Sequence, residues 1–422
     1  MKALRLTFAI GIALANLAAY AALNIPSDGS DGDLIITNDT VIDLSQAVTG
    51  NWDADNSANA GKGIYDATKW AVVFKYSSVT IQSGATVTFK NHPSHAPVVW
   101  LVGGDVIIDG TLSLNGQGYQ TAPALPEPGP GGFRGGSGYF TSGVGHGAGF
   151  GPGGGSRRNS AYSTIGSGGS YGTVGGYGPA TYGNPSVLPL LGGSGGGGGA
   201  YNGGVDRSGG AGGGAIQIAC SGSLTVNGMV RANGGSGANN DGGRYSGGGT
   251  GGAIRLVAAQ LSGDGSVQAL GGGVFFAGGL GRIRLERAVN AANLTINPDP
   301  SIVPLEDGST PLIWLPSDGP TARIVSIGEV NAPADPRASF GTVGQDVTLP
   351  QVSTTPVVVE TVNAEAASVV TVRVTPRANG DYTETTATLT QTNSTSPLTL
   401  LWTANVPVSL GYSAVQVKVV RP

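Results

Sequence analysis

Large apolar residues alternate with small or polar ones in several short stretches of the chain, and this pattern predicts β-strands with two different faces. The clearest stretches contain Ile216, Ile254 and Ile283, where GAIQIAC, GAIRLVA and GRIRLE share one arrangement. Residues 98–116, VVWLVGGDVIIDGTLSLNG, form an earlier copy. In each copy we expect one face of the strand to be buried and the other to be in contact with water.

Further short strands follow each of these copies, with turn residues between them. The turns are Asp109-Gly110, Asn227-Gly228 and Gly263-Asp264-Gly265. Asn, Asp and Gly tolerate the positive φ that a tight bend requires, so we expect that conformation here. A repeat that keeps its strands while its loops change in length is typical of a solenoid.

The motifs GGAIQI, GGAIRL and GRIRLE, with NG turns between them, extend over roughly residues 34–300. They resemble the Gly-rich right-handed parallel β-helix of secreted and surface proteins of bacteria. The resemblance implies an all-β fold, a right-handed parallel β-helix (solenoid) with Gly-rich loop insertions. It implies no particular activity, because one fold can carry many functions.

The start of the chain predicts an export signal. Lys2 and Arg5 precede an apolar run over 6–17, and small residues stand before a cleavage point at Ala22. We therefore predict a signal peptide over 1–21, no membrane span after its removal, and a secreted, extracellular or cell-surface location in a bacterium.

The remaining chain divides by composition. Residues 22–75, with Trp52, predict an N-terminal cap, 76–300 the β-helix, and 301–320 a linker in which Trp314 plugs the last layer. Residues 321–422 contain seven strand candidates and predict a β-sandwich that resembles immunoglobulin-like or fibronectin-type modules in pattern only. Those candidates are Ala322–Val330, Asp346–Leu349, Pro356–Val362, Ser368–Thr375, Thr383–Thr392, Leu398–Val406 and Ser413–Val420.

Glycine dominates the composition, with 75 residues in 422, whereas charged residues make up only 11%. The net charge of −4 gives no reason to expect a nucleic acid partner. The long insertion 116–213 and the loops 233–252 and 271–281 leave the repeat at equivalent corners, which favours an ordered slab of Gly-rich chain; a flexible loop is the alternative. Aromatic side chains would act as pegs in this slab: Phe133, Tyr139, Phe140, Phe150, Tyr162, Tyr171, Tyr177, Tyr182 and Tyr201. With the arginines they would alternatively form a face that binds sugars or anions: Arg134, Arg157, Arg158, Arg207 and Arg244.

Two groups of residues invite a metal site. Asp28, Asp31 and Asp33 have the close spacing of calcium ligands, but the rest of a calcium loop is missing, so a solvated turn is favoured. His92 and His95 lack further ligands nearby, and a plain loop is favoured over zinc. We predict no metal, no cofactor and no catalytic residue.

The single cysteine, Cys220, is in phase with buried strand positions, and we expect a buried small apolar residue rather than a nucleophile.

An enzyme is the competing hypothesis, because pectin-cleaving enzymes use β-helices. Gly145-His146-Gly147 and Arg282-Ile283-Arg284 resemble elements of polygalacturonases, in the same order. Glycoside hydrolysis needs paired carboxylates, and no Asp-Asp pair exists in the chain. Arg282 also falls at a repeat position that we match with Gln217 and Arg255. A lyase would need clustered acids, and the candidates are dispersed: Asp105, Asp109, Asp206, Asp241 and Asp264.

The sequence therefore favours a secreted, non-catalytic surface protein with an adhesive, matrix or structural role. We expect weak, repeated contacts along its face, with a polysaccharide or cell-surface glycan as partner, or self-association through exposed edges. A polysaccharide-active enzyme and a non-catalytic carbohydrate-binding protein are the alternatives.

Overall fold

The computed structural model describes residues 21–121, 124–138, 147–159, 164–199, 207–240, 244–273, 275–336, 345–350, 353–377, 380–393 and 396–422. Apart from Ala21, the predicted export signal lies outside the described residues. So do several residues named above: Tyr139, Phe140, Gly145, His146, Tyr162, Tyr201, Asp206 and Asp241. The described chain consists of strands, two short 3-10 helices and irregular segments, so the all-β class is confirmed.

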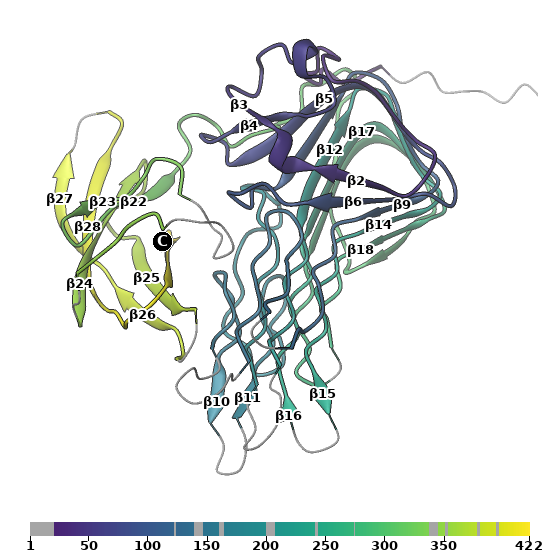
Figure 1. Cartoon of the computed structure of the whole chain (residues 1–422). Coiled ribbons are helices and arrows are strands. Elements are labelled where there is room, and N and C mark those ends of the chain that lie inside the picture. The colour runs from purple at the N-terminus through teal and green to yellow at the C-terminus, as the bar shows by residue number, and fades with distance from the viewer. Residues whose placement is uncertain are drawn as a thin grey trace, which may run out of the picture.

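Residues 32–304 supply the strands of two large, mainly parallel sheets and of two small hairpins (Figure 1). The main sheet contains β1 (Gly32–Ile36), β3 (Val48–Thr49), β4 (Ile64–Asp66), β5 (Ala71–Ile81), β7 (Val98–Val102), β8 (Val106–Ile108), β12 (Ala215–Cys220), β13 (Ser223–Val226), β17 (Ala253–Gly263), β19 (Arg282–Ala292) and β21 (Ser301–Pro304). The second sheet contains β2 (Thr40–Asp43), β6 (Thr86–Lys90), β9 (Thr111–Ser113), β14 (Met229–Arg231), β18 (Ser266–Gln268) and β20 (Thr295–Asn297). The hairpins are β10 (Arg157–Asn159) with β11 (Thr164–Gly166) and β15 (Asn239–Asn240) with β16 (Arg244–Tyr245), and the 3-10 helices are η1 (Leu44–Gln46) and η2 (Ser57–Asn59).

Strand pairing corrects the predicted fold class. In the described main sheet, β5 pairs with β7 and β8, these pair with β12 and β13, and both of the latter pair with β17. Six parallel strands thus form a closed barrel with further sheets packed outside it, and the prediction of a right-handed β-helix solenoid is wrong. The closure arises because β5 and β17 each run through 11 residues, whereas Gly103-Gly104 separates β7 from β8. Each long strand therefore pairs with two short ones.

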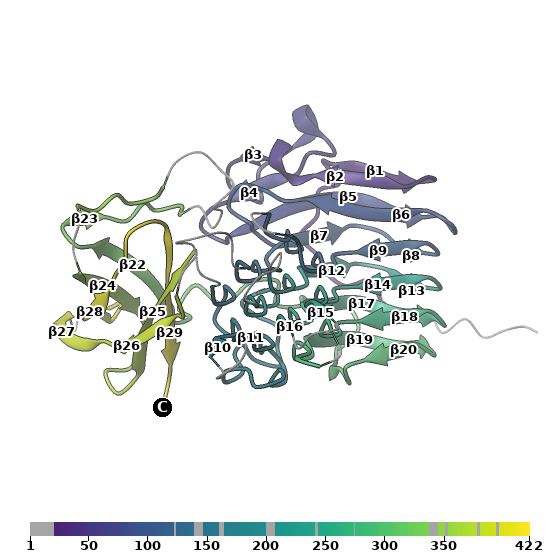
Figure 2. The same cartoon turned by 60° about the horizontal axis from the view of Figure 1, so that its bottom comes forward.

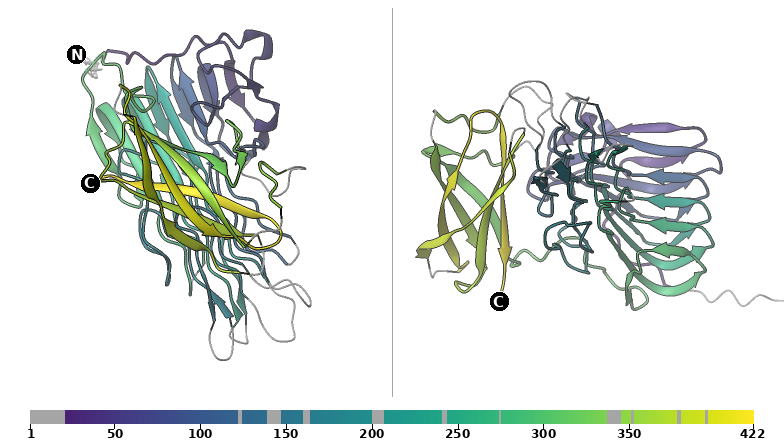
Figure 3. Two further views of the ribbon diagram at one scale, coloured as in Figure 1. Left: turned by 90° about the vertical axis from the view of Figure 1, so that its left-hand side faces the viewer. Right: turned by 90° about the horizontal axis from the view of Figure 1, so that it is seen from below.

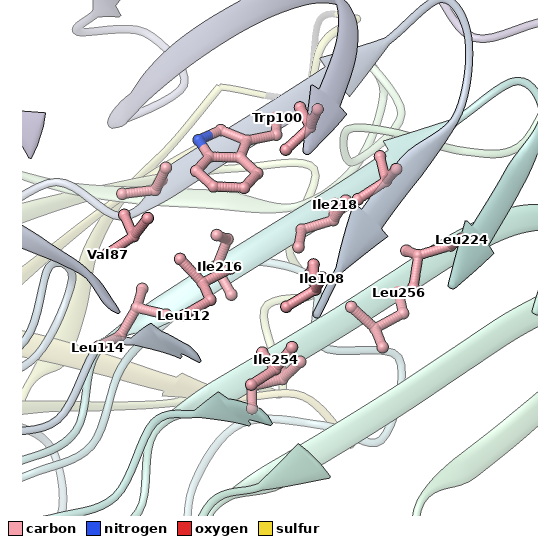
Figure 4. Packing of buried hydrophobic residues seen from close by; sticks show 14 of the residues in the cluster. Val87, Trp100, Ile108, Leu112, Leu114, Ile216, Ile218, Leu224, Ile254 and Leu256 are labelled. Atoms are coloured by element: carbon pink, nitrogen blue, oxygen red, sulfur yellow. The ribbon is translucent and has the colours of Figure 1, made fainter. Parts of the chain in front are cut away.

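The hydrophobic core lies between the main sheet and the second sheet. Parallel pairing brings equivalent residues of successive strands into rows, so that Val98 lies beside Ile216, and Ile216 beside Ile254. Figure 4 shows such side chains converging from several strands, and Figure 2 shows the strands stacked one above another. Trp100 is the largest fully buried side chain in this cluster. The apolar positions of the repeat are thus confirmed as core.

The expectation that the other face of these strands is wet is wrong for β12 and the first half of β17, where every residue is buried. The chain returns across that face after β21. Leu305 and Ile313 pack there with Leu23 and Ile25 from the N-terminal extension, in a second apolar cluster. The segment predicted as part of a linker is therefore a strap, defined here as residues 305–315, laid over the main sheet.

Glycine-rich segments run side by side away from the sheets and form what we call the glycine bundle: 114–120, 129–136, 147–155, 166–172, 192–199, 208–214, 232–238, 246–252 and 271–281 (Figure 1). Backbone hydrogen bonds join them with a period of three. Gly193, Gly196 and Gly199 donate to the segment 207–213, while Gly195 and Gly198 donate to 147–150. A period of about three residues per turn is that of the polyproline II helix, which has no internal hydrogen bonds. Each segment therefore bonds to several neighbours in turn, and the predicted ordered slab is confirmed for the described residues.

The bundle requires glycine because its chains are too close for side chains. A Cβ on Gly198 would lie 1.8 Å from the carbonyl oxygen of Ser137, and one on Gly212 would lie 1.8 Å from that of Gly193. The predicted turns follow the same rule: a Cβ on Gly228 would lie 1.9 Å from the oxygen of Gly110 in the adjacent layer. Among the residues of those turns, only Gly263 has a positive φ, +101°, so the predicted conformation is confirmed there and is wrong for the other turn residues. At Gly110 and Gly228, close approach of the backbone is the reason for glycine.

The C-terminal region forms two antiparallel sheets around a separate apolar core, which is a β-sandwich (Figure 3). One sheet contains β22 (Thr321–Ile327), β23 (Val330–Asn331), β24 (Thr354–Val362), β27 (Thr388–Asn393) and β28 (Thr399–Pro407); the other contains β25 (Val369–Pro376), β26 (Thr383–Thr386) and β29 (Ser413–Val420). Trp402 is buried in its core, as predicted, and donates Nε1–H to Thr361 Oγ1 at 2.9 Å. The predicted strand at Asp346–Leu349 is absent from the described residues there.

Candidate functional site

Arg282 is tied into the protein framework. Its guanidinium lies over the ring of Tyr171, 5.5 Å from the centroid, and Nη2 donates to the carbonyl oxygen of Tyr182 at 2.9 Å. Strand register pairs Arg282 with Ala253, so Arg284, and not Arg282, continues the row of Gln217 and Arg255; the sequence match was wrong by two residues. His146, the other residue of the polygalacturonase-like pair, lies outside the described residues.

Two of the dispersed acids, Asp105 and Asp109, form contacts between layers. Asp105 Oδ1 accepts from the backbone N–H of Ser223 at 2.7 Å, and Asp109 Oδ1 accepts from Asn227 Nδ2 at 2.8 Å. Within the described residues, no three His, Cys, Asp or Glu side chains gather as a metal site. These carboxylates stabilise the stack of strands.

The three aspartates proposed as calcium ligands have separate structural roles. Buried Asp31 accepts from Asn56 Nδ2 at 2.7 Å and from the N–H of Lys75 at 2.8 Å. Asp28 pairs with the Lys75 ammonium at 2.7 Å, and Asp33 accepts from Ser78. Lys75 Nζ also donates to the carbonyl oxygens of residues 53 and 54. The positive charge beside these aspartates is therefore the ammonium of Lys75 in β5, which the sequence pattern did not reveal.

The two histidines lie in the packed turn before β7. The His92 ring stacks on Tyr65 at 4.1 Å, and its Nδ1 lies 2.8 Å from Ser94 Oγ. His95 is 5% exposed, and burial, helped by the positive charge of Arg134, lowers its pKa to about 4. Both histidines thus have packing contacts within the protein.

A buried polar group lies under the strap. Arg255, 1% exposed, donates Nε–H to Glu286 Oε1 at 3.0 Å and Nη2–H to the carbonyl oxygen of Leu312 at 2.7 Å. Gln217 joins the group, bonding Arg255 and the carbonyl oxygen of Ile313. Burial lowers the pKa of Arg255, and the Glu286 carboxylate opposes that shift. Polar residues at the outward positions of GAIQI and GAIRL thus hold the strap instead of meeting water.

Cys220 is fully buried, and burial raises its pKa far above the usual range of a thiol. It belongs to the main core cluster. The prediction of a small buried apolar residue is confirmed.

The strap ends against the N-terminal cap and forms a pocket with it. Trp314 meets Trp52, with ring centroids 5.5 Å apart and planes inclined at 56°. The Lys69 ammonium lies 5.8 Å from the centroid of the Trp314 ring. The pocket has a volume of about 700 Å³ and is lined by Asn24, Ile25, Pro26, Trp52, Lys69, Thr310, Pro311, Leu312, Ile313, Trp314 and Leu315. Trp314 was predicted to plug the last layer; that is wrong, because the strap carries it back to the cap at the other end.

Aromatic residues of the glycine bundle divide into an inner and an outer group. Tyr171 and Tyr182 are buried, with ring centroids 4.5 Å apart, and their hydroxyls donate to the carbonyl oxygens of Leu191 and Gly192, which confirms the predicted pegs. In the outer group, the ring centroid of Phe276 lies 5.7 Å from that of Tyr177 and 5.6 Å from that of Tyr245. The ring centroids of Tyr245 and Phe275 are 5.2 Å apart. Tyr177 is 70% exposed and Phe275 62%. We call Tyr177, Tyr245, Phe275 and Phe276 the aromatic row.

The β-sandwich is fastened to the glycine bundle by Arg373 of β25. This side chain is 4% exposed, and its guanidinium donates to the carbonyl oxygens of Pro152 at 3.1 Å and Gly154 at 2.8 Å. Tyr382 covers the guanidinium at 3.5 Å. A second contact joins Tyr65 Oη to Asp335 Oδ1 at 2.5 Å. The carbonyl oxygens of Pro152 and Gly154 in the bundle thus bind the second module.

No protein-family model, curated protein or solved structure matches the chain. The likeness to secreted surface proteins therefore stays a prediction from the repeat motifs. The helices found in the described residues are too short to span a membrane.

Proposed function

We propose that this chain is a secreted, non-catalytic surface protein of a bacterium, with an adhesive or matrix role. Export rests on the charged start, the apolar run and the small residues before Ala22. The protein acts as a rigid support whose contacts with a glycan or with other copies are individually weak and gain strength by repetition.

The glycine bundle is the observation that carries the proposal. Backbone hydrogen bonds at every third residue join neighbouring segments, and Arg373 joins the bundle to the β-sandwich. Such an array has few side chains with which to do acid–base chemistry, but it holds its shape without flexible side chains. This combination fits a supporting element better than an enzyme.

The competing enzyme would need two carboxylates directed at one groove. Asp105 and Asp109, two of the candidate acids, instead bond groups of the neighbouring layer, and Arg282 bonds the carbonyl oxygen of Tyr182. These contacts support the non-catalytic proposal.

A carbohydrate-binding role is the second candidate, and the aromatic row favours it. Exposed aromatic rings offer apolar faces on which the C–H face of a sugar ring can stack. Tyr177 and Phe275 are more exposed than large aromatic residues usually are in a soluble domain. This role is compatible with adhesion, because a surface protein holds its target by such contacts.

The test is a co-sedimentation assay with bacterial cell envelopes and with insoluble polysaccharides, combined with measurement of released reducing ends and, for lyase products, of unsaturated sugars. We expect co-sedimentation without release of either product. Release of cleaved sugar that is lost in the Arg282→Ala variant, with an unchanged circular dichroism spectrum, refutes the non-catalytic proposal.

A further inference from the structure

The pocket between the strap and the cap has the lining of a sugar site. Trp52 and Trp314 meet at 56° and form an angled apolar wall, and Leu312 and Leu315 at its edge are 51% and 39% exposed. Its volume of about 700 Å³ lies within the range of small-molecule sites, which is about 300–1,000 Å³.

Two distant parts of the chain build this wall. Trp52 belongs to the cap, whereas Trp314 arrives on the strap. The strap is held by buried contacts, since Arg255 and Gln217 bond the carbonyl oxygens of Leu312 and Ile313 directly before Trp314. The pocket is therefore formed before any ligand binds, which lowers the ordering entropy that binding would cost.

The positive charge of Lys69 determines which ligands with an apolar ring face fit the pocket. Lys69 is exposed, its ammonium lies 5.8 Å from the centroid of the Trp314 ring, and it forms no ion pair within the described residues. The nearby carboxylate of Asp66 is buried and accepts from the N–H of Trp52 and from Thr68. A ligand with an apolar ring face and a carboxylate at its edge would satisfy both the indoles and the ammonium. A cationic ligand would be repelled.

We propose that Trp52, Trp314 and Lys69 bind an acidic pyranose, a uronic acid unit of a polysaccharide. The C–H face of the sugar stacks on the indole wall, and the carboxylate of the sugar pairs with the Lys69 ammonium. The proposal rests on the glycan contact proposed above and gives that contact a substrate class.

The experiment is calorimetric titration of the full chain with an oligogalacturonate and with the matching neutral galactose oligomer. An exposed ion pair contributes little, so we expect the acidic oligomer to bind about two- to fivefold more tightly. Lys69→Met removes this preference and its salt dependence, while Lys62→Met, on an exposed lysine of the same cap, leaves both unchanged. Trp314→Ala weakens both oligomers about tenfold or more.

Each other outcome has a defined meaning. An acidic preference that survives Lys69→Met overturns the proposal, and this variant keeps the test valid if Trp314→Ala fails to fold. Binding that is lost in a Tyr177→Ala/Phe275→Ala double variant but retained in Trp314→Ala moves the glycan to the aromatic row and overturns the pocket. Absence of sugar binding with continued co-sedimentation on cell envelopes overturns the pocket alone, whereas loss of both overturns the proposed adhesive function too.

Discussion

Replacing Gly212 by alanine tests the close packing of the glycine bundle. The added Cβ would lie 1.8 Å from the carbonyl oxygen of Gly193. A carbon–oxygen contact of this kind needs about 3.3 Å, so the two segments must part by about 1.5 Å. Two backbone hydrogen bonds next to this contact join the two segments: Gly193 donates to Gly213 at 2.8 Å, and Gly196 donates to Gly210 at 2.9 Å. Separation by that amount breaks hydrogen bonds of this length.

The energetic cost follows from the broken bonds. Each buried backbone group that loses its partner costs about 1–3 kcal/mol. With two such bonds lost, and one unpaired group counted for each, we expect Gly212→Ala to destabilise the bundle by about 2–6 kcal/mol. Gly118→Ala is the matched control in the same bundle, because its Cβ would lie 3.5 Å from the oxygen of Ser236, an ordinary contact. Alanine there restricts the unfolded chain and stabilises by up to about 1 kcal/mol.

The assay is thermal unfolding followed by circular dichroism, with hydrogen exchange of segments 193–199 and 208–214 measured by mass spectrometry. We expect opposite signs: a lower Tm and faster exchange for Gly212→Ala, and an unchanged or higher Tm for Gly118→Ala. Equal Tm values and equal exchange in the two variants refute the inference that backbone hydrogen bonds hold the bundle segments together at distances too short for a side chain.

Three further predictions concern the modules and the cap. Arg373→Ala removes buried hydrogen bonds to the bundle, so we expect a larger radius of gyration by small-angle X-ray scattering. Arg323→Ala removes only an exposed ion pair and should leave the radius unchanged. Equal radii in the two variants contradict the fastening role of Arg373. Burial lowers the pKa of His95 to about 4, so the unfolded chain takes up the proton first and stability falls as pH drops from 6.5 toward 4. His95→Asn, which tolerates the positive φ of 53°, should flatten Tm over this window, and an unaltered pH profile argues against the assignment. Calcium or a chelator should leave Tm unchanged because Asp28 and Asp31 already have donors; a rise with calcium contradicts this.

The sequence predicted strands and core positions well, because period-two alternation reports burial directly. Ile216, Ile254 and Ile283 form one parallel row as expected. The sequence did not predict what covers the outer face of the main sheet. Gln217 and Arg255 were expected to be exposed to solvent, but they bond the strap, which is distant in sequence. Tertiary cover of this kind leaves no local signal. The closed pairing of the main sheet was missed for a similar reason, since it depends on which strands continue without a bend.

The candidate pocket was equally hidden from sequence reasoning. Trp52 and Trp314 were each noticed as single residues, at opposite ends of the predicted stack, and nothing in their spacing joins them. Lys69 carried no pattern at all. For the glycine segments, composition suggested either order or flexibility; the period of three decides between them, and that period lies in the partners of the hydrogen bonds rather than in the residue types.

A helix with three residues per turn constrains how the bundle can change in length. Gly193, Gly196 and Gly199 face one neighbour, so inserting one residue between them would turn every later donor toward a different chain. Inserting three would restore all of the pairings and lengthen the segment by about 9 Å, at about 3.1 Å per residue. Adjacent antiparallel segments must lengthen together to keep their partners. Insertions and deletions in the glycine bundle are thus expected to come three residues at a time, and in two adjacent segments together.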